Sequence, residues 1–306
     1  MTSPHVAALR SVALNVPDPD HAVDFYTRVW RLDVADRRDG VVYLRGTGPA
    51  HHLLALHPAE RAEVRNVTFQ ARSVDALRVL AEQAVQAGGR ILEPVAPVVE
   101  PGGGVALTVA DPDGRIFRFV HGDVAHVADV AANGATVPDR PVRLAHVVLN
   151  SHDVARSQRF FEQALGFKLS DRTRMMAFLR CNNDHHSVAF GDSDRDSLNH
   201  IAFLMPDLDS VMRGGGRMKD AGYPVGWGPG RHGPGNNAFN YFVGPFDMVI
   251  EYTAEVQQVD DSYPTGGPED WTWPPGRIDQ WGIGQPPTPQ IKAAQQAIFF
   301  TPVTAL

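Results

Sequence analysis

The sequence predicts an α+β fold built from tandem βαβββ modules. The first observation is an internal repeat, because the segment from Leu9 (LRSVALNVPDPDHAVDFYTRVWRLDV) recurs from Leu144 (LAHVVLNSHDVARSQRFFEQALGFKL). The second is the small drift of the offset, from 135 residues between Asn15 and Asn150 to 133 near the end of the copies. The third is the abundance of glycine (28) and proline (24), which favours many turns and short strands, mostly antiparallel. Periodicity of this kind indicates a duplicated structural unit.

Each copy contains two successive units, and each unit consists of a strand, a helix and several short strands. In the second copy, VRLAHVVLN is apolar enough for a strand, and Asp153 can cap the helix that follows. The short strands MMAFLR and HHSVAF flank the turn CNND. NHIAFLM begins the second half, a helix is predicted from about Leu208 to Asp220, and NAFNYFV and MVIEYT complete the unit. The run GGG at 214–216 interrupts that helix without a functional interpretation.

The repeat divides the chain into four regions. An N-terminal module is expected over 1–122, a linker short of large apolar residues over 123–141, a C-terminal module over 142–256, and a Pro/Gly/Trp-rich tail over 257–306. Such a tail can be disordered. Three tryptophans, Trp271, Trp273 and Trp281, instead favour docking, because each ring gains much from burial.

Bulk properties exclude several classes of function. With 306 residues, 43% of them hydrophobic, the chain is long enough for two domains with substantial cores. The net charge of -7 argues against nucleic acid or an anionic membrane as a partner. The first twenty residues do not resemble a signal peptide, and no apolar run approaches the ~18 residues of a membrane span. The lone Cys181 excludes an intramolecular disulfide, so we expect a cytoplasmic protein.

Three polar residues stand inside apolar segments of the second copy. They are His146 in LAHVVLN, His200 in LNHIAFLM and Glu251 in MVIEYT. A buried charge is costly without a partner, and no basic residue lies near Glu251 in the sequence. Two imidazoles and one carboxylate form the facial triad that binds non-heme Fe(II), although zinc accepts the same set. A single strand histidine is more often a core residue, but the three together favour a metal site.

The first copy provides an internal control for this triad. Its equivalent positions hold Ser11, Asn66 and Arg118. The scaffold is therefore kept in both copies, whereas the ligand set occurs only in the second. We expect the N-terminal module to be free of metal.

The chain resembles the vicinal oxygen chelate superfamily over about residues 5–256 and, within it, the type I extradiol ring-cleaving dioxygenases. The most specific segment is GPGRHGPGNNAFNYFVGPFDMVIEYTAE, with His232, then Tyr241 nine residues on, then the ligand Glu251. The resemblance implies catalytic roles for His232 and Tyr241 at the substrate oxygens. It assigns the oxygen-side acid–base role to His186, with His185 as the alternative. Taken singly, His232 in its glycine-rich loop could merely be exposed, and Tyr241 could be a core residue.

The resemblance also implies an activity, which is extradiol cleavage of a substituted catechol by O2, with Fe(II), or alternatively Mn(II), at His146, His200 and Glu251. The tail EDWTWPPGRIDQWG is similar to the active-site lid of the homoprotocatechuate branch, in which arginines hold the substrate carboxylate. Here Arg277 remains, but Ile278 follows it and Trp227 precedes the GPGRH loop. We therefore expect a less charged catechol, with Trp227, Arg277 and His185 as substrate-binding residues.

Two alternatives remain open at this point, a glyoxalase-like metal isomerase or lyase, and a non-enzymatic binding or resistance protein of the same fold. The family is often oligomeric, so the resemblance also implies a homo-oligomer.

Overall fold

The structure is a computed structural model that describes residues 3–131 and 137–303. The first module comprises β1 (Val6–Val16), α1 (Pro19–Asp24), a π-helical turn (Phe25–Val29), β2 (Asp33–Arg38), β3 (Val41–Arg45), β4 (Leu54–Pro58), β5 (Glu63–Ala71), α2 (Val74–Gln86), β6 (Arg90–Pro97), β7 (Val105–Ala110) and β8 (Ile116–His121).

The second module repeats this order and is followed by the tail. It comprises β9 (Arg143–Ser151), α3 (Val154–Leu165), β10 (Lys168–Arg172), β11 (Met176–Arg180), β12 (Val188–Asp192), β13 (Ser197–Leu204), α4 (Leu208–Asp220), β14 (Trp227–Arg231), β15 (Ala238–Val243), a 3-10 turn (Pro245–Asp247) and β16 (Val249–Ala254). The tail contributes α5 (Pro289–Ala294) and β17 (Ile298–Phe299).

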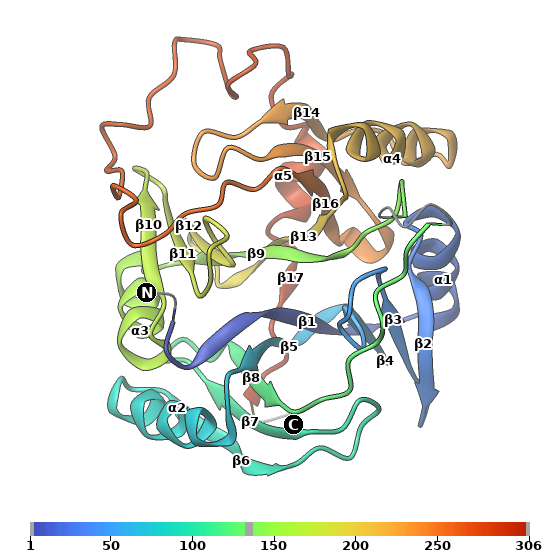
Figure 1. The fold of residues 1–306 in the computed structure, drawn as a ribbon. Coiled ribbons are helices and arrows are strands. Elements are labelled where there is room, and N and C mark those ends of the chain that lie inside the picture. The colour runs from blue at the N-terminus through green and yellow to red at the C-terminus, as the bar shows by residue number, and fades with distance from the viewer. Residues whose placement is uncertain (1–2, 132–136, 304–306) are drawn as a thin grey trace.

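The two modules have the same sheet topology. The strand order is β2-β3-β4-β1-β5-β8-β7-β6 in the first sheet and β10-β11-β12-β9-β13-β16-β15-β14 in the second. Within each βαβββ motif the first and last strands pair in parallel, as β1 does with β4 and β13 with β16, and the other pairings are antiparallel. In Figure 1 the blue-to-green module lies below the green-to-orange one. The predicted α+β fold of tandem βαβββ modules is confirmed.

Local sequence signals place the two helices of the second module. Asp153 caps α3 by accepting a hydrogen bond from the backbone N–H of Arg156 at 2.9 Å. Helix α4 has the predicted bounds, and two of its three glycines, Gly214 and Gly215, have a packing role. A Cβ on Gly214 would lie 2.7 Å from the ring of Tyr252, so the glycine permits close approach of α4 to the sheet.

The interior between the modules is aromatic. Trp30 of the first module is fully buried and stacks on Tyr252 of the second, with ring centroids 3.6 Å apart. Phe117 of β8 meets Phe161 of α3 edge to face at 5.0 Å. These contacts make one continuous core from residues of both modules.

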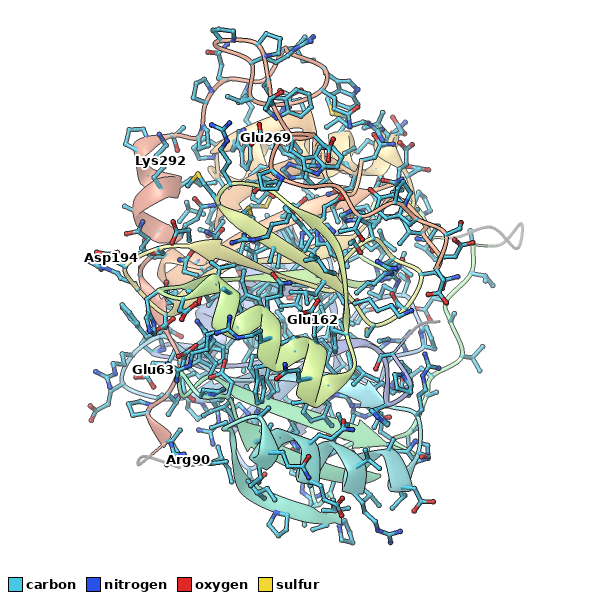
Figure 2. All side chains as sticks on the ribbon, turned by 90° about the vertical axis from the view of Figure 1, so that its left-hand side faces the viewer. Glu63, Arg90, Glu162, Asp194, Glu269 and Lys292 are labelled. Carbon is cyan, nitrogen blue, oxygen red and sulfur yellow. The ribbon has the colours of Figure 1, made fainter. Side chains whose placement is uncertain are left out.

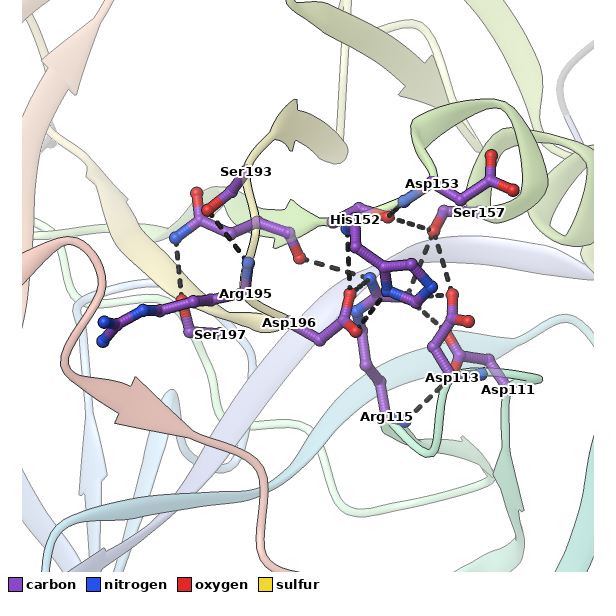
Figure 3. Close-up of polar contacts among 12 residues, drawn as sticks. Asp111, Asp113, Arg115, His152, Asp153, Ser157, Ser193, Arg195, Asp196 and Ser197 are labelled. Carbon is purple, nitrogen blue, oxygen red and sulfur yellow. Dashed lines mark hydrogen bonds and ion pairs between the residues drawn. The ribbon is translucent and has the colours of Figure 1, made fainter.

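A buried ionic cluster also joins the modules (Figure 3). Arg115 follows β7 in the first module and has only 1% of its side chain exposed. Its guanidinium donates to Asp111 at 2.8 Å and Asp113 at 3.0 Å in its own module, and to Asp196 and Ser157 of the second module at 2.5 and 3.1 Å. Ionic groups this deeply buried need such partners, so the cluster fixes the contact between the modules.

The tail returns from the second module to the first. Strand β17 pairs with β13, and two residues later the N–H of Thr301 donates to the carbonyl of Val64 on β5. Figure 2 shows Glu269 of the tail at one end of the molecule and Arg90 of the first module at the other. The sequence predicted neither α5 nor β17.

The predicted linker lies only partly within the described residues, because 132–136 fall outside them. Its first part follows the first module, where the N–H groups of His126 and Asp129 donate to the carbonyls of Pro49 and Thr47. Within the described ranges, no helix combines the length and apolar character needed to cross a bilayer. The homo-oligomeric state and the cellular location stay predictions.

Candidate active site

Three adjacent strands in the centre of the second sheet carry His146, His200 and Glu251. His146 on β9 lies opposite Ala202 on β13, and Ala202 lies beside Glu251 on β16. His200 precedes Ala202 by two residues, and residues two apart on a strand face the same side. The strand register therefore directs all three side chains to one face of the sheet.

The three donor groups converge at hydrogen-bond distances. The Nε2 atoms of His146 and His200 lie 3.1 and 3.2 Å from Oε2 of Glu251, and 3.4 Å from each other. Donor atoms bound at about 2.1 Å to one ion, with angles of roughly 90–110°, lie about 3.0–3.4 Å apart. All three side chains are buried. The spacing, the burial and the chemistry of the donors fit a divalent metal ion.

The protonation states also suit a metal. Burial alone would raise the pKa of Glu251, but His146 and His200 lower it well below the ordinary value of a carboxyl group. Burial lowers the pKa of His200, which favours the neutral imidazole. The Nδ1 atom of His200 lies 2.8 Å from Oδ1 of Asn199, a partner that directs the Nε2 lone pair toward the centre. Among the described residues no lysine or arginine pairs with Glu251.

His232 and Tyr241 meet on one side of the triad. The Nε2 atom of His232 lies 2.9 Å from the Tyr241 hydroxyl, and the Tyr241 ring packs edge to face on His200 at 4.9 Å. Burial lowers the pKa of His232 to about 4 and raises that of Tyr241 well above its usual value. Both groups are therefore neutral near pH 7. Trp227 stacks on Tyr241 at 4.9 Å and holds this pair from the β14 side.

His186 stands beside His146, on the other flank of the triad. Their ring centroids are 4.2 Å apart, and His186 lines the adjoining cavity. Burial, followed by the neighbouring histidines, holds the pKa of His186 well below its ordinary value. His185 is fully buried behind it and does not line the cavity. Of the two candidates for the oxygen side, His186 is the one beside the triad.

A buried chain of polar groups connects His186 to the tail. The Nδ1 atoms of His185 and His186 are 3.1 Å apart, and Nε2 of His185 lies 2.6 Å from Oδ2 of Asp171 on β10. The tail donates two hydrogen bonds to the same carboxylate, from the Tyr263 hydroxyl at 3.0 Å and the Gly266 N–H at 2.7 Å. No local sequence pattern indicates a role for Asp171, because its partners in the tail lie more than 90 residues away along the chain.

The cavity beside the triad has a volume of about 290 Å³ and mostly apolar walls. Phe178 and Met176 of β11 form one wall, and Trp273 and Ile278 of the tail close another. No arginine or lysine is among the described residues that line it. Arg277, which we expected at the substrate, is exposed on the tail, and its neighbour Ile278 lines the cavity instead.

A family model described as the Glyoxalase/Bleomycin resistance protein/Dioxygenase superfamily matches residues 5–119 and 143–252. The two segments coincide with the two modules and make up more than half of the chain. The chain belongs to this superfamily. Both the duplicated scaffold and the metal-type triad, the one such cluster among the described residues, therefore belong to a member of this superfamily.

Several relatives in the superfamily are extradiol dioxygenases by name. Metapyrocatechase 2 from Cupriavidus necator is 35% identical over 155 residues, and this match spans 48% of the present chain and 46% of that relative. A manganese-dependent 2,3-dihydroxybiphenyl 1,2-dioxygenase from Geobacillus genomosp. 3 is 22% identical over 260 residues, or 78% and 82% of the two chains. An iron-dependent extradiol dioxygenase from Rhodococcus jostii is 28% identical over 172 residues, or 51% and 57%.

A solved structure covers nearly the whole chain. The Mn(II)-bound glyoxalase from Novosphingobium aromaticivorans matches with a TM-score of 0.86 and 34% identity, over 95% of the present chain and 94% of the other. The names of these relatives therefore include dioxygenases and a glyoxalase. The metals in those names are iron in one case and manganese in two.

Proposed function

We propose that this protein cleaves an uncharged, substituted catechol at an extradiol bond, using O2 and a divalent metal, Fe(II) in the first instance. The observation that carries the proposal is the set of neutral proton-carrying groups around the triad, namely His186 on one flank and His232 with Tyr241 on the other. When bound, the metal supplies adjacent coordination positions for the catechol oxygens and O2, and a route for electron density between them.

His232 and Tyr241 are suited to hold the substrate oxygens. Tyr241 is buried and His232 is partly buried, both are neutral, and they already share a hydrogen bond of 2.9 Å that a catechol oxygen can join. A catechol must lose a proton as it chelates, and a neutral imidazole near the metal is a suitable acceptor. On the opposite flank, His186 can accept a proton and later return it to an oxygen atom, the two steps of general acid–base catalysis.

The walls of the cavity support an uncharged substrate. Recognition of a carboxylate usually relies on the paired donors of an arginine, and no described arginine or lysine lines this cavity. Trp227, Phe178 and Ile278 instead offer apolar surface. We therefore propose an alkyl or aryl substituent on the ring, packed against these side chains.

A glyoxalase-like isomerase is the second candidate, favoured by the 34% identical Mn(II)-bound glyoxalase. Against it, all three candidate ligands come from one module. The equivalent residues of the other module, Ser11, Asn66 and Arg118, line a different cavity. The two activities differ in one simple respect, because isomerisation consumes no O2.

The test begins with metal-free protein loaded anaerobically with Fe(II), Mn(II) or Zn(II) in parallel. Each form is mixed with 4-methylcatechol, 3-phenylcatechol and a carboxylated catechol of similar size, and O2 uptake is followed together with the visible absorbance of a ring-opened product. We expect one O2 consumed per catechol cleaved, the Fe(II) form to be the most active, and the carboxylated compound to be the poorest substrate.

A 2-oxoaldehyde–thiol adduct tests the second candidate on the same preparations. Isomerisation of that adduct, with no O2 uptake from any catechol, would overturn the dioxygenase proposal. A preference for the carboxylated catechol would overturn the substrate class alone.

A further inference from the structure

The first module encloses a cavity of its own, of about 330 Å³, at the place where the second module has the active-site cavity. The strand registers place equivalent residues of the two modules at the same positions of the two sheets. Ser11 lies opposite Thr68, and Thr68 lies beside Arg118, just as His146 lies opposite Ala202 beside Glu251. Arg118 therefore occupies the position of the carboxylate ligand.

The charge at this position is inverted. A guanidinium from Arg118 and an amide from Asn66 line the first cavity where the second has a carboxylate and an imidazole. Within the described residues, the metal-type cluster of His146, His200 and Glu251 has no counterpart in the first module. Hydrogen-bond donors with positive charge suit an anion and not a cation.

The charges around this cavity balance only while Glu100 stays beside Arg118. Arg10, Arg65 and Arg118 line the cavity, against two carboxylates, Glu93 and Glu100. Arg10 is neutralised from outside the cavity by Asp123, at 2.9 Å. Glu93 already accepts a hydrogen bond from Thr108 at 2.6 Å. Arg65 donates to the neutral side chain of Asn15 at 3.3 Å, and no described carboxylate pairs with it.

Arg118 itself is only partly paired. Its Nη1 donates to Glu100, whereas its Nε is buried and has no partner among the described residues. Glu100 is 43% exposed and lies in the connection between β6 and β7, where Pro101 separates it from Gly102, Gly103 and Gly104. Because its side chain is partly exposed, Glu100 can rotate away from the guanidinium toward solvent. Glu100 thus occupies a position that an external carboxylate can take.

The remaining walls of the cavity limit the polarity and the size of the rest of the ligand. Ala13, Ala55, Ile91, Ile116 and Val120 offer apolar surface around the charged positions. A cavity of about 330 Å³ has room for a single ring or a short chain beside the carboxylate.

We propose that the first module binds a small organic carboxylate, held by Arg118 and Asn66 with Glu100 displaced, its apolar body against the walls of this cavity. The site does not depend on the activity of the second module. The proposal therefore stands or falls separately from ring cleavage.

The test uses benzoate as the probe and benzamide, its neutral analogue of the same shape, as the control. Binding to the metal-loaded full chain is measured by isothermal titration. We expect the wild-type protein to bind benzamide about tenfold or more weakly than benzoate, because a charge-assisted pair is lost. Benzoate should bind to Arg118→Gln more weakly than to the wild type by a similar factor, for the same reason. Arg118→Lys keeps the charge without the fork and should give an intermediate affinity.

Glu100→Gln should change the affinity for benzoate in the opposite direction. It removes the internal competitor and should strengthen benzoate binding several-fold, with unchanged metal content and melting temperature. This variant also keeps the proposal testable if Arg118→Gln fails to fold. Equal affinities for benzoate and benzamide, or undiminished benzoate binding by folded Arg118→Gln, or no gain from Glu100→Gln, would overturn the proposal.

Discussion

The Nε2 atom of His185 lies 2.6 Å from Oδ2 of Asp171, and neither side chain is exposed to solvent. A carboxylate accepts hydrogen bonds, so Nε2 of His185 carries the proton, and in the neutral imidazole Nδ1 is left as an acceptor. The Nδ1 of His186, 3.1 Å away, is then the donor. This arrangement leaves Nε2 of His186 with a free lone pair, the state required of a base.

Replacing Asp171 by asparagine should therefore impair catalysis through His186. One oxygen of Asp171 accepts from both His185 and Tyr263, and the other accepts from the N–H of Gly266, so an amide nitrogen at either position faces a donor and loses a hydrogen bond that holds the carboxylate and His185 in place. We expect Asp171→Asn to lower kcat by about 10–100-fold, the range typical of groups that orient a site residue. KM and metal content should change little, and the acidic limb of the kcat profile should move. Steady-state kinetics across pH, with metal analysis, checks this.

Asp36→Asn is the matched control, because Asp36 is the repeat equivalent of Asp171 and is exposed. It should leave kcat unchanged. Equal losses in the two variants would show that the effect of Asp171 is not specific to the chain leading to His186.

The contrast between these residues shows what the sequence could predict. His146, His200 and Glu251 were predictable because each interrupts a strand-like run, and the first copy supplied the comparison. Asp171 was not, because its contacts with Tyr263 and Gly266 join residues 92 and 95 positions apart. The tail residues show the same limit. Whether Arg277 or Ile278 faces the cavity depends on how an irregular segment turns, and no hydrophobic periodicity specifies that direction.

Removal of one ligand should release the metal. His200→Ala deletes one of three donors that converge within hydrogen-bond distance, and the remaining two cannot hold a divalent ion tightly. We expect the metal content after gel filtration to fall from about one ion per chain to below roughly a tenth. Elemental analysis by mass spectrometry measures this directly.

Asn66→Ala is its counterpart in the first module and should keep a full complement of metal. Retention of metal by His200→Ala would place the ion elsewhere in the chain. Loss of metal from Asn66→Ala would mean that the two modules share the site.

Arg115→Met should strongly destabilise the fold. The guanidinium is the common partner of Asp111 and Asp113, whose side chains are at most 1% exposed. Removing it leaves Asp111 buried without a cationic partner, and Asp113 keeps only Arg156, at 3.3 Å. We expect the free energy of unfolding to fall by about 3–5 kcal/mol. Denaturant unfolding followed by tryptophan fluorescence provides the measurement.

The control for this variant is Arg213→Met, which removes an arginine whose side chain is 64% exposed and pairs with Asp209 on the surface of α4. Its effect should stay within about 0.5 kcal/mol. Similar losses in the two variants would contradict a special role for the cluster around Arg115.

Gly214 and Gly216 of α4 should respond to alanine with opposite changes in stability. Nothing lies within 4 Å of a Cβ built on Gly216, so Gly216→Ala should stabilise the protein by about 0.5–1 kcal/mol through helix propensity. On Gly214 the same Cβ would lie 2.7 Å from the ring of Tyr252, which cannot retreat because it stacks on Trp30 at 3.6 Å. Overpacking of this kind costs about 1–3 kcal/mol, which exceeds the propensity gain. Gly214→Ala should therefore lower the melting temperature while Gly216→Ala raises it. An increase in both would mean that α4 moves away from the sheet at little cost.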